Sequence, residues 1–307
     1  MLSSLAAYWR PLRRRLRQRL HLGRYGRSGI EQRLEAAEHD VAALLKRLHP
    51  NIAAGHTRAP GFHDYEIRLA SQHGEDGLLL HILSAAGVTD RRVVEFGIED
   101  GRECLARTLI EYFGWSGLLM DCAAANVSDA REFYRHELGM DEDRVRVVRC
   151  LVTAENINDV LTDNRFTGRI GLLSIDIDGN DYWVWKAIDA IQPRVVVIEY
   201  NASFGPAASL VTVYDQAFDR KAKHPSGWYH GASLAALAGL ADRRGYALVG
   251  CDSSGVNAFF VHRHLLRGSL PEVSVADAWR PHRSRSERAT QDEQLSLLLS
   301  LPLLSDA

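Results

Sequence analysis

Residues 93–101, with the sequence VVEFGIEDG, constrain the fold of this chain more than any other stretch. A β-branched pair leads into Glu95, and two glycines, Gly97 and Gly101, follow four residues apart. A helix-compatible run, RECLARTLIEYF, comes directly after them. Glycine adopts backbone conformations that other residues avoid, and it lets the backbone approach a ligand closely. The stretch therefore predicts a strand, a tight turn and the N-terminus of a helix.

A second strand is predicted in WSGLLMDC, at residues 115–122, and it ends in Asp121. An acidic residue at the end of the second strand of such a unit commonly holds a nucleotide ribose. Glu95 would repel a phosphate and attract a positively charged sulfonium, which favours S-adenosylmethionine (SAM) over NAD or ATP. The alternative is that the two glycines only allow the helix to pack closely on the strand.

Charge is distributed unevenly along the 307 residues. Residues 1–27 contain eight arginines and no acidic residue, so removing them from the net charge of −2 leaves −10 for residues 28–307. The negative charge of residues 28–307 does not favour binding to nucleic acid. The four cysteines are far apart, which is typical of buried thiols and not of a disulfide framework. Together with the absence of an apolar signal segment, this predicts a cytoplasmic protein.

The N-terminal 60 residues are predicted to form an arm outside the main domain. Residues 1–27 mix leucines with the arginines, which is typical of a basic amphipathic helix lying on the inner membrane surface. The alternative is a helix packed on protein with its arginines in water. Residues 28–48 carry a heptad stripe that suits a coiled coil in a homo-oligomer, or an arm laid across the domain. A linker follows, to residue 60.

Helical and strand-like segments alternate from residue 71 onward. Helices are predicted at 71–87, 102–113 and 231–245, and another begins near residue 154. Strands are predicted at 93–97, 117–122, 144–152, 170–178, 194–201, 246–252 and 257–263. Such alternation predicts an α/β fold with a mostly parallel sheet, to which the final hairpin adds one antiparallel edge strand. Ligands then bind at the carboxyl ends of the strands.

Acidic side chains gather at the ends of the fourth and fifth strands. SIDIDGNDYW supplies Asp176, Asp178 and Asp181, and IEYNAS supplies Glu199 and Asn201. Crowded carboxylates are costly unless a cation is present or some are protonated. Oxygen ligands suit Mg²⁺, Mn²⁺ or Ca²⁺. The alternative is that these aspartates only cap the helix that follows.

The segment HPSGWYHGAS, at 224–233, offers aromatic faces and a possible base, His230. Flat aromatic faces suit a sugar ring. The alternative is a structural loop whose aromatic residues pack on the core.

Together, VEFGIEDG, SQHGED, SIDIDGNDYWVWKAI, VVVIEYNASFGP and the segment from residue 231 to about 261 resemble the FkbM-type and related SAM-dependent methyltransferases. The resemblance covers about residues 65–263 and implies a Rossmann-like seven-stranded methyltransferase sheet. It implies methyl transfer to a hydroxyl, often on a sugar. The first motif lacks a third glycine, and DIDGND stands where the family usually has DVEGAE.

The resemblance also implies roles for particular residues. The methionine end of SAM would contact Glu95, Gly97 and Gly101, with Gln72 and Glu75 close by, and Asp176 lies beside this cofactor site. Asp121 would hold the ribose, and Leu151 and Val152 would flank the adenine. Asp176, Asp178, Glu199 and Asn201 occupy the places where metal-dependent O-methyltransferases keep Mg²⁺ or Mn²⁺. Asp178 and His230 are the candidate catalytic bases.

These observations predict an arm at 1–60, a methyltransferase domain at 61–263 and a C-terminal tail at 264–307. The tail is expected to be irregular to about residue 294, and its apolar segment 295–304 is expected to dock on the domain or on a partner. The leading hypothesis is a SAM-dependent O-methyltransferase acting on a sugar, a glycan or a glycosylated intermediate. A second hypothesis is a non-catalytic scaffold that binds SAM or a glycan. A third is a metal-dependent α/β enzyme of another class.

Overall fold

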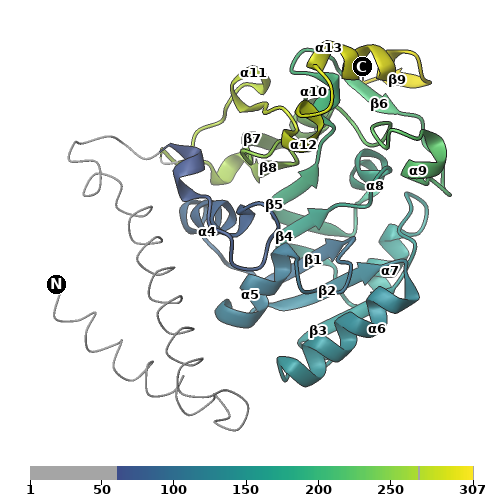
Figure 1. Cartoon of the computed structure of the whole chain (residues 1–307). Helices are drawn as coiled ribbons and strands as arrows, with labels where there is room; N and C mark the ends of the chain where they lie inside the picture. The colour runs from purple at the N-terminus through teal and green to yellow at the C-terminus, as the bar shows by residue number, and fades with distance from the viewer. Residues whose placement is uncertain (1–60, 269, 307) are drawn as a thin grey trace, which may run out of the picture. The chain divides into compact units, whose positions relative to one another are not determined.

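The computed structural model describes residues 61–268 and 270–306, which centre on a seven-stranded sheet of order β3-β2-β1-β4-β5-β8-β7 (Figure 1). Strands β1 to β5 run parallel, and β8 pairs antiparallel with both β5 and β7. The strands are β1 (Arg92–Phe96), β2 (Ser116–Asp121), β3 (Val145–Arg149), β4 (Gly168–Ile175), β5 (Ile191–Glu199), β7 (Tyr246–Cys251) and β8 (Asn257–His262).

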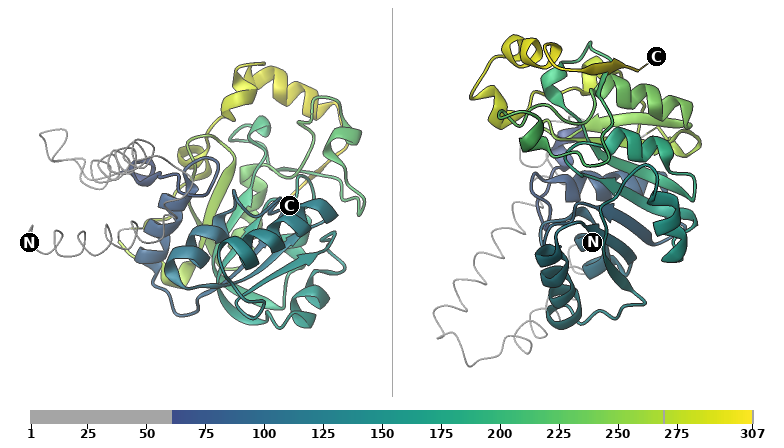
Figure 2. Two further views of the ribbon diagram at one scale, coloured as in Figure 1. Left: turned by 60° about the horizontal axis from the view of Figure 1, so that its bottom comes forward. Right: turned by 90° about the vertical axis from the view of Figure 1, so that its right-hand side faces the viewer.

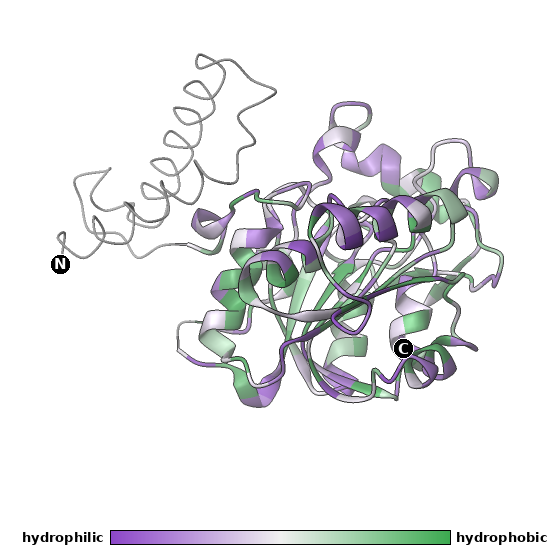
Figure 3. Cartoon of the chain, turned by 90° about the horizontal axis from the view of Figure 1, so that it is seen from below, coloured by the Kyte–Doolittle hydropathy of each residue, from purple (hydrophilic) through white to green (hydrophobic). Residues whose placement is uncertain are grey.

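Helices cover both faces of this sheet (Figure 2), and the strands between them are largely hydrophobic (Figure 3). Successive strand residues face opposite sides, so Val94 and Phe96 belong to one core whereas Val93 belongs to the other. One face carries α4 (Glu75–Ala86), α5 (Leu105–Phe113), α6 (Ala124–Glu132) and η2 (Phe133–Glu137). The other carries α7 (Ile157–Asp163), α8 (Asp181–Ala187), α10 (Leu234–Arg243) and α11 (Val275–Ala278).

The predicted fold class is confirmed: the sheet has seven strands and is mostly parallel. Its antiparallel strand, β8, is inserted next to the edge strand β7. The chain moves outward from β1 to β2 and β3, then returns to β4 on the other side of β1. Strand order thus reverses between β1 and β4, and a crevice at the carboxyl ends of such strands is where α/β proteins bind ligands.

The first predicted helix begins at Glu75 and not at residue 71. Gly74 has a left-handed conformation, with φ of 97°, which ends any helix that approaches from its N-terminal side. The carboxylate of Asp76 accepts hydrogen bonds from the backbone N–H groups of Leu69, Ala70 and Ser71. These bonds fold residues 69–74 into a turn over the helix N-terminus.

The segment after residue 263, predicted to be irregular to about residue 294, is ordered over its described residues, and residues 295–304 pack on the domain as expected. It contains η4 (Arg263–Leu265), α11, α12 (Arg283–Ser286), α13 (Gln291–Leu299) and β9 (Leu303–Ser305). Strand β9 pairs antiparallel with β6 (Leu210–Thr212), and Leu298 is fully buried against Phe204 and Tyr229. Long-range packing that leaves little periodicity in the sequence therefore holds this segment on the domain. The remaining short helices are η1 (Phe62–Tyr65), η3 (Ala202–Phe204) and α9 (Arg220–Lys223).

The predicted amphipathic helix at 1–27 and the heptad helix at 28–48 lie outside the described residues. Within 61–268 and 270–306, no helix is both long and apolar enough to cross a membrane.

Candidate functional site

The glycine turn after β1 is closed against β4 and η2. Gly97 has φ of 75°, and a Cβ placed on it would lie 1.6 Å from the carbonyl oxygen of Asp176. Gly101 has φ of 74°, and a Cβ there would lie 2.8 Å from the ring of Tyr134. Side chains at these positions would clash as well as strain the backbone. Both glycines are therefore required by the fold, and Gly97 brings the turn directly against the end of β4.

Glu95, at the carboxyl end of β1, is buried with only 5% of its surface exposed. Its carboxylate accepts hydrogen bonds from the backbone N–H groups of Leu105 at 3.0 Å and Ala106 at 2.7 Å, and from the hydroxyl of Ser174 at 3.2 Å. It thus caps the N-terminus of α5, where the helix dipole favours a negative charge. Burial raises the pKa of this carboxyl, and the hydrogen bonds oppose the rise. Direct contact of Glu95 with the cofactor stays a prediction.

Asp121 connects the end of β2 to the glycine turn. Its Oδ2 accepts from the backbone N–H of Glu99 at 3.0 Å, and its Oδ1 accepts from the N–H of Ala123 at 2.8 Å. The side-chain amide of Asn126 donates to the same Oδ1 at 3.1 Å. Glu99 has φ of 50°, a left-handed conformation that this hydrogen bond helps to hold. Asp121, the residue predicted to hold the ribose, therefore lies beside the turn predicted to hold the methionine end of SAM.

The other predicted cofactor residues lie on α4, just before it, and in the loop after β3. Gln72 is exposed, just before α4, whereas Glu75 is buried. Glu75 accepts a hydrogen bond at 3.0 Å from Asn257, the residue paired with Glu199 in the sheet. Burial and the nearby carboxylate of Asp252 raise the pKa of Glu75. The predicted adenine neighbours differ in exposure: Leu151 is 56% exposed and Val152 is buried.

Three of the predicted metal ligands converge at the ends of β4 and β5. One carboxylate oxygen each of Asp176, Asp178 and Glu199 lies within 4.8 Å of the others. Asp176 remains open to solvent on one side, and partial burial followed by repulsion from Glu199 raises its pKa well above the usual range. Burial and, next, the carboxylate of Asp181 raise the pKa of Glu199 to about 8. Repulsion of this kind is expected where several carboxyls share one crevice.

Asp181 belongs to the same loop but serves the backbone. Its two carboxylate oxygens accept from the N–H groups of Ile177 and Gly179, both at 2.9 Å. Both donors belong to the loop before α8, so Asp181 closes this loop and does not cap the helix, which has no side-chain cap bond at Asn180.

Arg220, at the start of α9, supplies positive charge to the acidic group. Its guanidinium pairs with Asp178, and its Nη1 lies 3.9 Å from Oε1 of Glu199. Its Nε donates to the carbonyl oxygen of Gly227 at 2.5 Å, which holds it in place. The side chain of Asp178 is 65% exposed and that of Glu199 is 7% exposed. Asp178 is thus the accessible end of this ion-pair network.

Arg285, on α12, is buried behind the acidic group with 4% of its surface exposed. Its guanidinium donates to Oδ1 of Asn201 at 2.9 Å, to Oγ of Ser203 at 3.0 Å and to Nε2 of His230 at 2.8 Å. Burial lowers its pKa to about 10, so it stays charged at neutral pH. Neither Arg285 nor Arg220 follows any motif or spacing, and sequence reasoning missed both.

His230 and Asn201 are engaged in this network rather than open to a ligand. An arginine can only donate, so Nε2 of His230 is the acceptor and its proton resides on Nδ1, 3.4 Å from Oε2 of Glu199. Burial and the positive charge of Arg285 lower the pKa of His230 well below its usual value. The amide of Asn201 donates to the carbonyls of Trp228 and His230. Its Oδ1, the atom that would bind a metal, accepts from the N–H of Ser203 at 3.1 Å and from Arg285.

Comparison with known proteins identifies the family. The model of the methyltransferase FkbM domain matches residues 19–221. No curated protein matches. Among solved structures, an O-methyltransferase from Bacillus cereus in complex with SAH has a TM-score of 0.38 and 16% identity, over 71% of this chain and 89% of that one.

A putative sarcosine dimethylglycine methyltransferase from Galdieria sulphuraria gives a TM-score of 0.37 and 18% identity, over 57% of this chain and 62% of that one. The chain thus spans less than two thirds of that protein. Magnesium protoporphyrin IX methyltransferase from Synechocystis PCC 6803, with bound SAM, gives a TM-score of 0.39 and 10% identity, over 61% and 77%. Because these likenesses are weak, the family match carries the assignment, and it covers more than half of the chain. The chain belongs to the FkbM methyltransferase family.

Proposed function

We propose that this enzyme transfers a methyl group to a hydroxyl of a sugar, a glycan or a glycosylated intermediate. One observation carries the proposal: the glycine turn at Gly97 packs directly on the backbone of Asp176, which belongs to a group of three carboxylates. The turn is the predicted donor site, and carboxylates can accept the proton of a hydroxyl. Donor and acceptor sites would then share one crevice at the switch point of the sheet.

The residues around the turn fit SAM. Gly97 and Gly101 leave the backbone free of side chains, and Asp121 lies at the end of the adjacent strand with 8% of its surface exposed. These residues would hold the methionine end and the ribose. When bound, SAM supplies an electrophilic methyl group on a positively charged sulfur. The protein then has to align the acceptor with this methyl and exclude water.

Asp178 is the proposed general base. Its side chain is 65% exposed, against 7% for that of Glu199, and it pairs with Arg220. An ionised carboxylate can withdraw the proton from an acceptor hydroxyl, which is otherwise a weak nucleophile. His230, the other predicted base, is 1% exposed and its Nε2 accepts from Arg285. We therefore assign His230 a structural role in the buried network around Arg285.

A sugar acceptor is supported by aromatic residues next to this loop. The ring of Phe218 packs on Gly179, where a Cβ would lie 2.2 Å from it, and it stacks on Tyr229 with centroids 6.2 Å apart. Trp228 is half-buried beside them. Aromatic faces provide apolar contact area to a ligand that otherwise bonds through hydroxyls. The loop of Asp178 and the aromatic segment packed on Gly179 would thus offer a base and an apolar surface close together.

A divalent metal is the second way to activate the hydroxyl, and the grouping of Asp176, Asp178 and Glu199 within 4.8 Å favours it. A bound cation would lower the pKa of a coordinated hydroxyl. It would have to compete with the guanidinium of Arg220 for Asp178. Methyl transfer measured with added Mg²⁺ or Mn²⁺ and after chelation separates the two: activity that survives chelation leaves the proton to Asp178.

The test is methyl transfer from isotopically labelled SAM to a panel of sugars, glycans and nucleotide sugars, with primary amines as competitors. Product mass and NMR identify the methylated atom. Transfer to a hydroxyl that falls strongly in Asp178→Asn, and persists in the exposed control Asp143→Asn, supports the proposal. Transfer to amines alone would contradict it. SAM binding without transfer to any acceptor would favour the scaffold hypothesis.

A further inference from the structure

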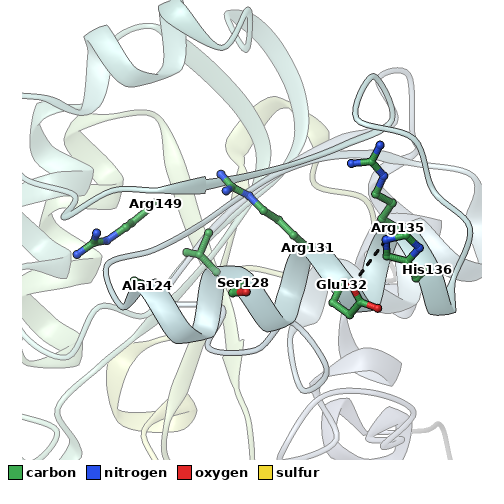
Figure 4. A pocket seen from close by; sticks show the side chains of 8 residues that line it. Ala124, Ser128, Arg131, Glu132, Arg135, His136 and Arg149 are labelled. Carbon is green, nitrogen blue, oxygen red and sulfur yellow. Dashed lines mark ion pairs between the residues drawn. The ribbon is translucent and has the colours of Figure 1, made fainter.

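A cavity of about 390 Å³ lies on the outer side of the sheet, between α6, η2 and the end of β3 (Figure 4). Three guanidinium groups line it, from Arg131, Arg135 and Arg149. Figure 4 shows the three side chains in a row along α6, with Arg149 contributed by the neighbouring strand. No part of the proposed methyl-transfer mechanism uses them.

Local structure explains why these arginines meet. Val145 and Val147 of β3 belong to the core beneath α6, and Arg149 follows on the same face of the strand at its end. On the helix, Arg131 and Arg135 are four residues apart, which places them on one side. Since β3 is an edge strand, this side of the sheet opens to solvent.

Two of the guanidinium groups are oriented by backbone carbonyls. Nε and Nη2 of Arg131 both donate to the carbonyl oxygen of Val147, at 3.0 and 2.8 Å. Nε of Arg149 donates to the carbonyl oxygen of Cys122 at 3.1 Å. Among the residues that the structure describes, the remaining nitrogens, Nη1 of Arg131 and both terminal nitrogens of Arg149, make no hydrogen bond to protein. The cavity thus presents fixed donors that need an acceptor.

The cavity is positively charged because three arginines and one carboxylate line it. Glu132 is the one carboxylate in its lining, and it pairs at 3.7 Å with His136. Arg135 lies 3.5 Å from Glu142, but both side chains are mostly exposed, at 66% and 82%. Such a pair contributes little and is easily displaced. Three guanidinium groups therefore face water with little compensation.

We propose that this cavity binds a phosphate group, as a phosphate monoester or a diphosphate. The planar guanidinium fork matches the spacing of phosphate oxygens, and several forks can share one phosphate or diphosphate. A single carboxylate has too few oxygens to satisfy three arginines. The phosphate belongs to a small molecule or to a lipid headgroup, which share this chemistry.

The site is separate from the methyl-transfer crevice. Strand β3 lies three places from β4 in the sheet order, which is roughly 14 Å at the usual spacing of about 4.8 Å per strand. It adjoins the predicted ribose site, because Arg149 is paired with Asp121 in the sheet and Asn126 of α6 donates to the Asp121 carboxylate. The proposal therefore holds whatever the acceptor is, and it places an anchoring contact far from the reacting hydroxyl.

The test is binding of inorganic pyrophosphate to the full-length protein, followed by calorimetry and by hydrogen exchange of residues 124–149. The double variant Arg135→Gln/Arg149→Gln is compared with Arg169→Gln, which alters an exposed arginine on β4. We expect protection of 124–149 in the wild type, with affinity falling at least about tenfold in the double variant only. Hydrogen exchange is needed to locate the bound pyrophosphate, because the arginines in residues 1–27 also attract anions and would contribute to the calorimetric signal.

Vesicles of phosphatidylglycerol and of phosphatidylcholine then identify the source of the phosphate. Anionic vesicle binding that the double variant weakens assigns the site to a lipid headgroup. Vesicle binding that it leaves unchanged, together with weakened pyrophosphate binding, assigns it to a soluble phosphate ester. Equal pyrophosphate affinity and equal exchange in the wild type and the double variant would overturn the proposal. Thermal unfolding of each variant confirms that the comparison is between folded proteins.

Discussion

Arg285 donates a hydrogen bond at 2.8 Å to Nε2 of His230, and this contact fixes the tautomer of a buried imidazole from a distance of 55 residues along the chain. The proton of His230 then resides on Nδ1, which lies 3.4 Å from Oε2 of Glu199 without forming a hydrogen bond to it. Both His230 and Arg285 lie beyond residue 221, where the family match ends. The segment after the matched region thus completes the charge network behind the acidic group.

Replacing Arg285 with methionine is expected to destabilise the domain by about 2–4 kcal/mol. The variant leaves His230 Nε2 buried without a donor and removes the bonds to Asn201 and Ser203. Denaturant unfolding at neutral pH measures the loss. Arg283→Met, an exposed change in the same short helix, is the control and should stay within about 0.5 kcal/mol of the wild type. Equal stability of the two variants would show that the buried network contributes nothing.

Gly97→Ala is expected to abolish SAM binding and to destabilise the fold more than Gly114→Ala. Both glycines have a left-handed backbone, with φ of 75° and 73°. A Cβ at Gly114 meets nothing within 4 Å, so this variant has only the backbone strain of about 1–2 kcal/mol. At Gly97 the Cβ would also overlap the carbonyl oxygen of Asp176. Unfolding free energies and SAM titrations of the two variants separate the effect of the clash from that of the backbone strain. Equal losses of stability and of SAM affinity in both variants would argue against the clash.

Asp121→Asn is expected to weaken SAM binding at least about tenfold. The asparagine keeps the shape but replaces one acceptor oxygen by an N–H₂ group, which would face the backbone N–H of Glu99 or of Ala123. Calorimetric titration of SAM measures the effect, and Asp129→Asn on the exposed side of α6 is the control. If affinity is unchanged while stability falls, Asp121 anchors the turn and does not hold the ribose.

The strands were predictable because their signals are local. The second, fourth and fifth strands are apolar runs that end in acidic residues, and such runs predict buried parallel strands whatever lies elsewhere in the chain. The same logic located the carboxylates at the ends of β4 and β5. Parallel strands bring their carboxyl ends to one edge, so Asp176 and Glu199 had to lie close together.

The cationic half of the site was not predictable because its contacts are long-range. Arg220 reaches Asp178 across 42 residues and Arg285 reaches Asn201 across 84, from polar segments without periodicity. Nothing in residue type or spacing distinguishes these two arginines from the exposed arginines around them. The capping role of Glu95 was missed for a related reason, since it depends on where α5 begins.

Glu199 makes stability depend on pH in a direction opposite to that of an ordinary surface carboxylate. Its folded-state pKa is raised from the usual 4.5 to about 8, so the folded protein binds a proton that the unfolded chain releases at lower pH. The stability from this group is complete below the unfolded pKa and is lost as pH rises toward 8. The charged and titratable groups that face it are Asp176, Asp178, Asp181, Arg220, His230 and Arg285.

Glu199→Gln is therefore expected to flatten the fall of unfolding free energy between about pH 5 and about pH 8. The amide keeps the size of the side chain and cannot ionise. Part of the slope should remain, because the pKa values of Asp176 and Asp181 are also raised and the carboxyls titrate as a group. The slope is measured by denaturant unfolding across this pH range in the presence of a chelator. The wild type, Glu199→Gln and the exposed control Glu287→Gln are compared. A slope in Glu199→Gln as steep as that of the wild type would mean that Glu199 is already ionised in the folded protein at acidic pH.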